Sequence, residues 1–322
     1  MISSTFSRPD DDAARDDVVA VLLAADPDGN RTARVLRSTF DQLYDGQHTG
    51  RFRVDQLHKT EKTHFGTLFE INFRREFDDI IKDGKKLDFL IAGHEIDAKY
   101  SFRMGSWMLP PESFGELLLV CTASDEKSEW ALGVVRATED RRRPGANRDA
   151  KSGLNRLGLS QVTWLKWAER LPPNVLLDTP PDDLKQIFRP GLSGQRRLLE
   201  LFRRVEGKRI GRNTIATVAQ QDDFMKRVRY NGGARSALQS EGFIIPGGDY
   251  SSHREVATHL GGPVPEAGEV VSFRLSPADD DEPNVTYLDG AWWRRATAED
   301  GPHHAPLLPV TSPVRKSQAE MK

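Results

Sequence analysis

One aspartate lies inside a short apolar run, and this feature constrains the fold more than any other in the sequence. The run Leu87–Ile91 has the length and composition of a buried strand, apart from the carboxylate of Asp88. A charge within a buried strand costs several kcal/mol unless it is paired or binds a metal ion. We therefore expect the fold to bring a cation or a metal site to Asp88.

A second strand-like run, His94–Phe102, follows after a two-residue connection, and this spacing predicts a hairpin. Alternate side chains of a strand project from one face. Asp97 and Lys99 are therefore expected to project together, with Glu95 on the same side. The hairpin also folds Asp88 back toward Asp97. The sequence thus predicts two carboxylates and one ammonium group at one place on a sheet.

An aromatic stripe upstream of the hairpin predicts a helix over about 62–78. Its phenylalanines repeat every four residues, at Phe65, Phe69, Phe73 and Phe77. Glu70 lies at the edge of this stripe. It can therefore face the sheet instead of open water, and it becomes a third candidate carboxylate.

Such a group of acidic side chains beside a lysine suits the hydrolysis of a phosphodiester. Mg²⁺ prefers oxygen ligands and keeps several of its waters. A bound metal ion polarises the phosphate and lowers the pKa of a water ligand. Lys99, placed between carboxylates, is expected to stay protonated, to orient the water and to offset charge in the transition state. The predicted metal ligands are Glu70, Asp88, Asp97 and Ala98, and the predicted catalytic residues are Glu70, Asp88, Asp97 and Lys99.

This spacing is the PD-(D/E)xK nuclease pattern, a short motif for which a solvated hairpin with surface Asp and Lys is the alternative. A longer resemblance supports the nuclease. The sequence resembles the NaeI-type restriction endonucleases over nearly its whole length, in the basic C-terminal half and in Phe40–Gly46 (FDQLYDG), Lys59–Gly66 (KTEKTHFG), Glu70, Asp88 and Asp97–Lys99. It departs from the named pattern at Leu87, where a proline would precede the aspartate.

The resemblance implies a homodimeric type IIE enzyme that uses Mg²⁺. Such an enzyme makes double-strand cuts in DNA at a palindrome, GCCGGC in this family, and binds a second copy of the site as an effector. The implied fold is an α/β PD-(D/E)xK core with a central mixed sheet, followed by an α+β winged helix-turn-helix domain like that of the catabolite activator. By position, the resemblance assigns catalysis to Glu70, Asp88, Asp97 and Lys99.

Prolines divide the chain of 322 residues into two parts. They cluster at 172–173, 180–181 and 190. We expect an endonuclease domain over 1–170, a linker over 171–190, a winged-helix domain over 191–300 and a disordered tail over 301–322. Residues 1–16 are expected to be frayed.

Further elements follow from hydrophobic periodicity and turn residues. We expect helices over 18–23, 33–44 and 162–170, and strands over 116–121 and 130–136. Near the end of the chain, Asp289-Gly290 predicts a hairpin that joins strands over 285–288 and 291–295.

The second part of the chain has a strongly basic stretch. Ten basic and four acidic residues between 196 and 229 give a local charge of +6, although the whole chain has a net charge of −2. Predicted helices over 195–205, 214–219 and 224–238, the last interrupted at Gly232-Gly233, lead into a strand over 243–245, the order of a winged helix-turn-helix. A basic patch of this kind is typical of a phosphate-binding surface. The alternative is a solvated helix face.

The predicted DNA contacts lie in two regions. A recognition helix and its neighbours would supply Arg196, Arg197, Arg209, Arg212, Lys226, Arg227, Arg229, Asn231 and Arg235. A polar loop over 141–151 offers Arg141, Arg142, Arg143 and Arg148, since Arg pairs with guanine edges. A disordered, solvated loop is the alternative for this second group.

The sequence excludes several other classes of function. It has no phosphate-binding G-x-x-x-x-G-K-[ST] loop and no G-x-S-x-G elbow, so neither a nucleotide cofactor nor serine hydrolysis is expected. One cysteine, no signal peptide and no apolar run near ~20 residues lead us to expect a soluble cytoplasmic protein without membrane contact. Two alternatives to the restriction enzyme stay open, namely a non-catalytic winged-helix DNA-binding regulator and a nicking or repair nuclease.

Overall fold

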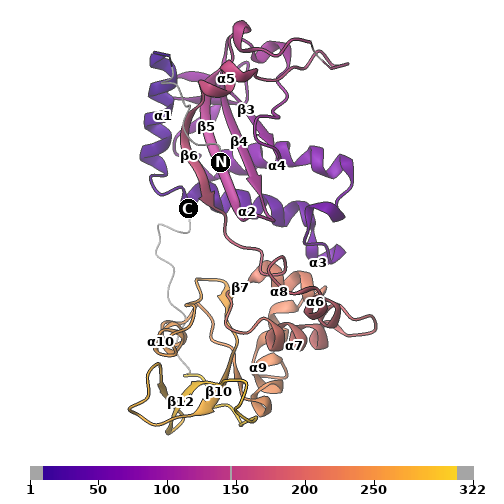
Figure 1. Ribbon diagram of the computed structural model, residues 1–322, viewed down its shortest axis with the longest axis vertical. Helices are drawn as coiled ribbons and strands as arrows, with labels where there is room; N and C mark the ends of the chain where they lie inside the picture. The colour runs from indigo at the N-terminus through magenta and orange to yellow at the C-terminus, as the bar shows by residue number, and fades with distance from the viewer. Residues whose placement is uncertain (1–9, 146, 310–322) are drawn as a thin grey trace. The chain divides into compact units, whose positions relative to one another are not determined.

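The chain divides into two compact units, each described here by itself from a computed structural model (Figure 1). The structure describes residues 10–145 and 147–309. The first unit takes in the chain up to Tyr44 and then Arg53–Pro173. The second unit takes in Asp45–Phe52 and the chain from Asn174 onward. The short internal segment Asp45–Phe52 thus packs with the second unit, which no feature of the sequence indicated.

A six-stranded mixed sheet forms the centre of the first unit. The strands lie in sequence order, and only β3 and β4 are parallel neighbours. Their bounds are β1 Ile81–Asp83, β2 Phe89–Ile91, β3 His94–Ser101, β4 Leu117–Ser124, β5 Glu129–Arg136 and β6 Thr163–Arg170. The expected hairpin and the strands expected over 116–121 and 130–136 are confirmed. The α/β class with a central mixed sheet is confirmed as well.

Helices cover one face of this sheet (Figure 1). They are α1 (Ala13–Ala25), α2 (Asn30–Tyr44) and α4 (Lys59–Glu76), and the short 3₁₀ helix η1 (Val54–Gln56) precedes α4. The four phenylalanines of the aromatic stripe are at most 1% exposed, and three of them belong to α4. They share one core with Ile96 and Ala98 of β3. The helix predicted from their spacing is therefore confirmed.

Irregular chain and the short helix α5 (Arg156–Ser160) cover the other face of the sheet. Leu118 and Val120 of β4 pack there against Trp107 and Leu109, which belong to the connection between β3 and β4. That connection also contains the 3₁₀ helix η2 (Pro111–Ser113). Opposite faces of a strand carry alternate residues, and Asp97 is paired in register with Leu118. Asp97 and Lys99 therefore lie on the face that this connection covers.

An ionic network fixes the C-terminal end of α2. The Asp125 side chain is inaccessible to solvent and accepts hydrogen bonds from Arg37 Nη1 at 2.5 Å and from the Tyr44 hydroxyl at 2.8 Å. Arg37 also contacts Asp41 at 2.8 Å. Because buried charges need partners, the network joins α2 to the turn after β4 at the point where the chain leaves the first unit.

The stretch expected to be a helix over 162–170 is a strand, β6. It pairs with β5 in an antiparallel ladder that contains a register shift, and Ala168 has a positive φ of 51°. Val162, Thr163 and Trp164 are β-branched or aromatic, types that fit a pleated surface. Pairing along β5 therefore outweighed the helix-like spacing of the apolar residues.

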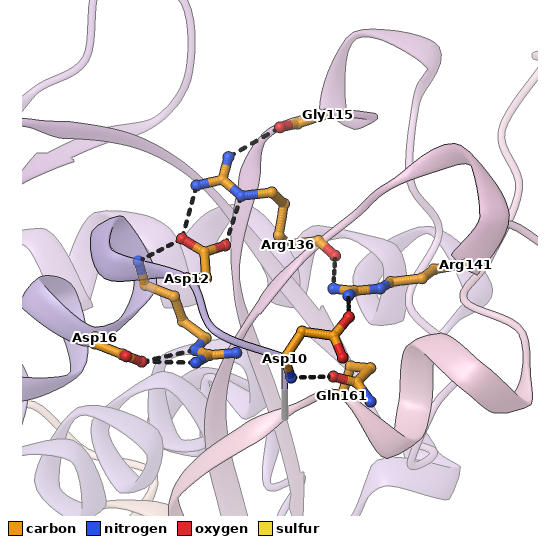
Figure 2. Close-up of polar contacts among 8 residues, drawn as sticks. Asp10, Asp12, Asp16, Gly115, Arg136, Arg141 and Gln161 are labelled. Atoms are coloured by element: carbon orange, nitrogen blue, oxygen red, sulfur yellow. Dashed lines mark hydrogen bonds and ion pairs between the residues drawn. The ribbon is translucent and has the colours of Figure 1, made fainter. Parts of the chain in front are cut away.

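Residues 10–16 are ordered, which corrects the expectation of a frayed start. Asp12 caps α1, because its side chain accepts a hydrogen bond from the Arg15 amide. Asp12 also pairs with Arg136 at 2.6 Å, and Asp10 pairs with Arg141 at 2.6 Å (Figure 2). The pairing with Arg136 lowers the pKa of Asp12. Residues 1–9 lie outside the described part of the chain.

The second unit combines short helices with two small sheets. Its helices are α3 Gly46–Thr49, α6 Pro181–Ile187, α7 Gly194–Arg204, α8 Arg212–Ala219, α9 Ala234–Ala237 and α10 Ser251–His259. One sheet has the order β11-β12-β10-β8, and β7 pairs with β9. The strands are β7 Ile210–Gly211, β8 Phe243–Ile244, β9 Glu269–Val270, β10 Phe273–Pro277, β11 Thr286–Leu288 and β12 Ala291–Arg295. The hairpin predicted at Asp289-Gly290 is confirmed as β11 and β12.

Two predicted boundaries of this unit are wrong. The expected linker 171–190 contains α6, and its apolar side chains Val175, Leu176 and Ile187 belong to a buried core. The expected disordered tail packs up to residue 309: Ala305 and Leu308 are buried, and the Leu308 amide donates to the Tyr230 hydroxyl at 3.0 Å. Residues 310–322 lie outside the described part of the chain.

The helix predicted over 224–238 is interrupted more severely than its Gly-Gly pair suggested. The stretch holds a 3₁₀ helix, η4 (Phe224–Val228), and the single turn of α9. Gly232 has a φ of 74°, and a Cβ on Gly233 would meet the Arg229 carbonyl oxygen at 2.3 Å. These glycines therefore impose a tight turn within the stretch that was expected to form the recognition helix. Within the described residues, no helix combines the length and apolar content needed to span a bilayer.

Candidate active site

The β2–β3 hairpin brings the predicted aspartates together. Asp88 immediately precedes β2, and its Oδ2 accepts a hydrogen bond of 2.8 Å from the Ala98 amide of β3. Asp97 is 4% exposed although it is ionisable. The antiparallel pairing of Phe89 with Ile96 places Asp88 and Asp97 at the same level of the hairpin. The structure therefore joins two carboxylates that are nine positions apart in the sequence.

Lys99 supplies the positive charge beside these carboxylates. Its ammonium donates to Asp97 Oδ1 and, at 3.1 Å, to the carbonyl oxygen of Ala98. It also lies 3.9 Å from Asp88 Oδ2. Since the Lys99 side chain is 20% exposed, one side of the group remains open to solvent. The aspartates, the lysine and the carbonyl of Ala98 thus converge as the spacing predicted.

The environment of Asp88 raises its pKa to about 7. Burial is the largest cause, and the hydrogen bond and negative charge of Asp97 act in the same direction. The Ala98 amide and the Lys99 ammonium lower the pKa of Asp88, but they compensate only in part. Two carboxylates with one ammonium therefore leave an excess of negative charge that another cation would neutralise.

Glu95 fixes the loop that leads into Asp88, a role that sequence reasoning missed. Its carboxylate accepts hydrogen bonds from three successive backbone amides, those of Lys85 at 2.7 Å, Lys86 at 3.3 Å and Leu87 at 3.1 Å. These amides lower the pKa of Glu95. The signal was present in the sequence, since Glu95 shares the strand face of Asp97, but it did not indicate what the carboxylate binds.

Ser113 is the second residue that sequence reasoning missed. It is fully buried in η2, and its hydroxyl donates a hydrogen bond to Asp97 Oδ2. No spacing or motif indicates this contact, because Ser113 follows Asp97 by sixteen positions in an irregular connection. The two oxygens of Asp97 are thus bound by different residues, Lys99 on one side and Ser113 on the other.

Glu70 belongs to α4, whose phenylalanines pack on the face of β3 that carries Ile96 and Ala98. Its role as a metal ligand stays a prediction. Burial raises the pKa of Glu70, while Lys99 lowers it and Asp97 raises it further. Glu70 therefore interacts electrostatically with the site, but no hydrogen bond to the aspartates is seen among the described residues.

The donor atoms are the hard oxygens that Mg²⁺ prefers. They are the carboxylates of Asp88 and Asp97 and the carbonyl of Ala98. Within residues 10–145 and 147–309, no three His, Cys, Asp or Glu side chains are close enough together to hold a metal ion. The two carboxylates and the carbonyl nevertheless fit a divalent cation that keeps several of its waters.

The arginines of the polar loop after β5 differ in their accessibility. Arg141 is 7% exposed, because its guanidinium donates to Asp10 at 2.6 Å and to the Arg136 carbonyl at 3.0 Å (Figure 2). Arg143 donates to the carbonyls of Leu154 and Gly105. The guanidinium carbon of Arg142 lies 4.7 Å from the centre of the Phe114 ring, and Arg148 is exposed. Arg141 therefore supports the loop, whereas Arg148 can reach a ligand.

We expect Arg141→Ala to lower the free energy of unfolding by about 1–3 kcal/mol, the usual cost of unsatisfying buried hydrogen-bonding groups. The Arg136 carbonyl would lose its partner, and the N-terminal segment would lose its ion pair. Chemical denaturation measures the change, and Arg148→Ala is the matched exposed control, expected to lie within about 0.5 kcal/mol of the parent. Normal stability together with weakened DNA binding in Arg141→Ala would instead make Arg141 a DNA contact.

The predicted DNA-binding residues of the second unit also separate into two groups. Four of them are bound to other groups of the protein. Arg197 donates hydrogen bonds to the Val218 and Ala219 carbonyls at the end of α8, and Arg235 donates to the Ile245 carbonyl. Arg209 forms ion pairs with Glu266 and Glu269, and Arg227 forms one with Asp223. The exposed group consists of Arg196, Arg212, Lys226, Arg229 and Asn231. This exposed group offers the most accessible cations among the predicted contacts, and the Arg212 guanidinium carbon also lies 5.5 Å from the centre of the Phe224 ring.

Comparison with known proteins gives two concordant results. A family model described as restriction endonuclease NaeI matches residues 16–303. The chain is also 50% identical over 315 residues to a protein of Lentzea aerocolonigenes named type II restriction enzyme NaeI. That alignment covers 95% of this chain and 97% of the relative. Both matches extend across the two units, so the similarity is not confined to the aspartate hairpin.

Proposed function

The chain belongs to the restriction endonuclease NaeI family, and on that premise we propose that it is a Mg²⁺-dependent type II endonuclease that cuts both strands of DNA at a specific palindrome. The observation that carries the proposal is the meeting of Asp88, Asp97 and Lys99 on one strand face. A non-catalytic DNA-binding regulator does not need two carboxylates that share one ammonium group on a sheet. The family relation gives this arrangement a substrate, the phosphodiester backbone of DNA.

Asp88, Asp97 and the carbonyl of Ala98 would hold the metal ion, together with Glu70, which interacts electrostatically with Asp97 and Lys99. When bound, Mg²⁺ polarises the scissile phosphate and makes an attacking water more acidic. Lys99 donates hydrogen bonds to Asp97 Oδ1 and to the Ala98 carbonyl, beside the residues that would hold the ion. Its ammonium would orient the water and stabilise negative charge that develops on the phosphate.

The second unit is proposed to hold a further DNA site. It is the winged-helix effector domain in this proposal, with Arg196, Arg212, Lys226, Arg229 and Asn231 as its contacts. Homodimerisation and the palindrome GCCGGC, both implied by the family resemblance, belong to the same proposal. We also propose that the enzyme acts in the cytoplasm, which suits a chain whose single cysteine, Cys121, is buried and unpaired.

Digestion of a sequenced plasmid with Mg²⁺ tests the proposed activity. We expect discrete fragments whose ends all map to one palindrome, and no cutting when a chelator replaces Mg²⁺. Nicked circles without linear product would support a nicking or repair nuclease. Specific binding of the plasmid without any strand cleavage would support a DNA-binding regulator. Either outcome contradicts the proposed double-strand cleavage.

The exposed basic group should control how DNA binding depends on salt. Each neutralised phosphate contributes about 0.9 to the slope of log K against log salt concentration. Replacing Arg196, Arg212, Lys226 and Arg229 together by Ala should therefore reduce that slope by about 3 to 4 in the full-length protein. Lys185→Ala, in which an exposed lysine of α6 is replaced, is the control. An unchanged slope in the fourfold variant would exclude this surface as the phosphate contact.

A further inference from the structure

Ser113 is held rigidly over the face of the sheet that carries the aspartates. It is the last residue of η2, where its amide donates to the Pro110 carbonyl at 3.0 Å. Its own carbonyl accepts a hydrogen bond of 3.3 Å from the Glu116 amide, just before β4 begins. Both backbone groups of Ser113 are thus bound to neighbouring chain. The direction of its side chain is therefore set by the fold and not by solvent, from which it is fully shielded.

The hydroxyl of Ser113 engages one particular oxygen of Asp97. A serine hydroxyl has one hydrogen to donate, and here it is directed at Asp97 Oδ2. Lys99 binds the other oxygen, Oδ1. A serine that cannot turn away occupies Oδ2 permanently, whereas the lysine, on a flexible and partly exposed stem, can leave Oδ1.

We propose that Ser113 is a positioning residue that fixes Asp97 so that only Oδ1 is presented to the divalent cation. This inference rests on the proposed function, because it concerns how the same site binds its metal ion. Mg²⁺ demands nearly ideal octahedral geometry, so a carboxylate that can rotate or bind through both oxygens is a poorer ligand. Loss of an outer partner that orients a ligand typically reduces metal affinity or activity by about 10–100-fold.

The test measures metal binding separately from cleavage. In Ser113→Ala we expect the Mg²⁺ concentration for half-maximal cleavage to rise by about 10–100-fold. Calorimetric titration with Mn²⁺, without DNA, should show a similar loss of affinity. DNA affinity in the absence of metal should stay unchanged, because Ser113 is shielded from solvent and therefore from DNA. Ser113→Thr, which keeps the hydroxyl, should restore most of the metal affinity.

A matched variant separates this role from a structural one. Ser272 is also fully buried, and its hydroxyl donates to the Phe202 carbonyl at 2.7 Å in the second unit. Ser272→Ala should lose a similar amount of thermal stability without any change in Mn²⁺ affinity. If Ser113→Ala does not fold, Mn²⁺ affinity is measured in Ser113→Cys, which fills the site with a slightly larger group that is only a weak hydrogen-bond donor.

Failure of the positioning role can be distinguished from failure of the proposed function. A folded Ser113→Ala or Ser113→Cys with Mn²⁺ affinity within about twofold of the parent overturns the positioning role, even if the parent cleaves DNA normally. Equal losses of metal affinity in Ser113→Ala and Ser272→Ala would also overturn it, because the effect would then be general destabilisation. A parent protein that neither binds Mn²⁺ nor cleaves DNA contradicts the proposed function itself.

Discussion

Lys99→Ala should slow DNA cleavage by about 100- to 1,000-fold, the range seen when one preorganised group that stabilises transition-state charge is removed. The lysine is the only ammonium that the described residues place against the two aspartates, and its contacts go to Asp97 and the Ala98 carbonyl. DNA binding should persist, because one ammonium contributes little to binding of the backbone compared with the exposed arginines. Single-turnover cleavage of plasmid DNA and a gel-shift titration measure the two quantities.

Lys82→Ala is the control for this substitution, since Lys82 is an exposed lysine of β1 in the same sheet. It should cleave at the parental rate. Metal affinity offers a further check, because Lys99→Ala removes a competitor for Asp97 Oδ1 and should not weaken Mn²⁺ binding. A Lys99→Ala enzyme that cuts as fast as the parent would remove Lys99 from the catalytic set.

Asp88→Asn should abolish detectable cleavage and at the same time stabilise the metal-free protein at pH 8. The carboxyl of Asp88 has a pKa raised to about 7, well above its ordinary value near 3.9. A raised pKa means that the folded protein holds a proton that the unfolded chain releases. The resulting stability is fully present below pH ~4 and is lost as pH rises through about 7. At pH 8 the parent therefore carries an unfavourable charge that asparagine does not.

Thermal unfolding at pH 5 and pH 8 measures this effect. We expect Asp88→Asn to melt above the parent at pH 8, with a smaller difference at pH 5, and Mg²⁺ at pH 8 to stabilise the parent alone. Asp78→Asn, at an exposed position of the same unit, should leave both melting temperatures unchanged. Should Asp88→Asn melt below the parent at pH 8, the charge at Asp88 would not be a cost to the metal-free fold.

The aspartate hairpin was predictable because everything that forms it is local in the sequence. Alternation along a strand fixed the common face of Asp97 and Lys99, and a two-residue turn returned Asp88 to them. The aromatic stripe of α4 was predictable for a similar reason, since its period is that of a helix. Glu70 was harder to place, because a helical period does not say how far the edge of the stripe lies from the strand.

The residues that sequence reasoning missed or misassigned depend on contacts between distant segments. Ser113 reaches Asp97 from an irregular connection that has no period to read. Arg141 looked like a DNA contact because composition cannot distinguish a buried arginine from an exposed one. Its burial depends on its ion pair with Asp10, which is distant in the sequence. The stretch 162–170 was assigned to a helix because short apolar runs fit either period, and pairing with β5 made it a strand.

The path of the chain between the two units limits how the protein can be dissected. Asp45–Phe52 interrupts the first unit and packs in the second, where Phe52 stacks on Phe188 and the Phe52 carbonyl accepts a hydrogen bond of 2.9 Å from Asn174. A fragment that starts at residue 174 would lack this insert and expose the apolar surface beneath it. One protease cut near Pro173 would leave the two fragments associated without a covalent bond, because segment 45–52 of the first fragment packs against the second. Separate expression of either unit would therefore require residues 45–52 to be excised from the first unit or fused to the second, and a simple truncation would not suffice.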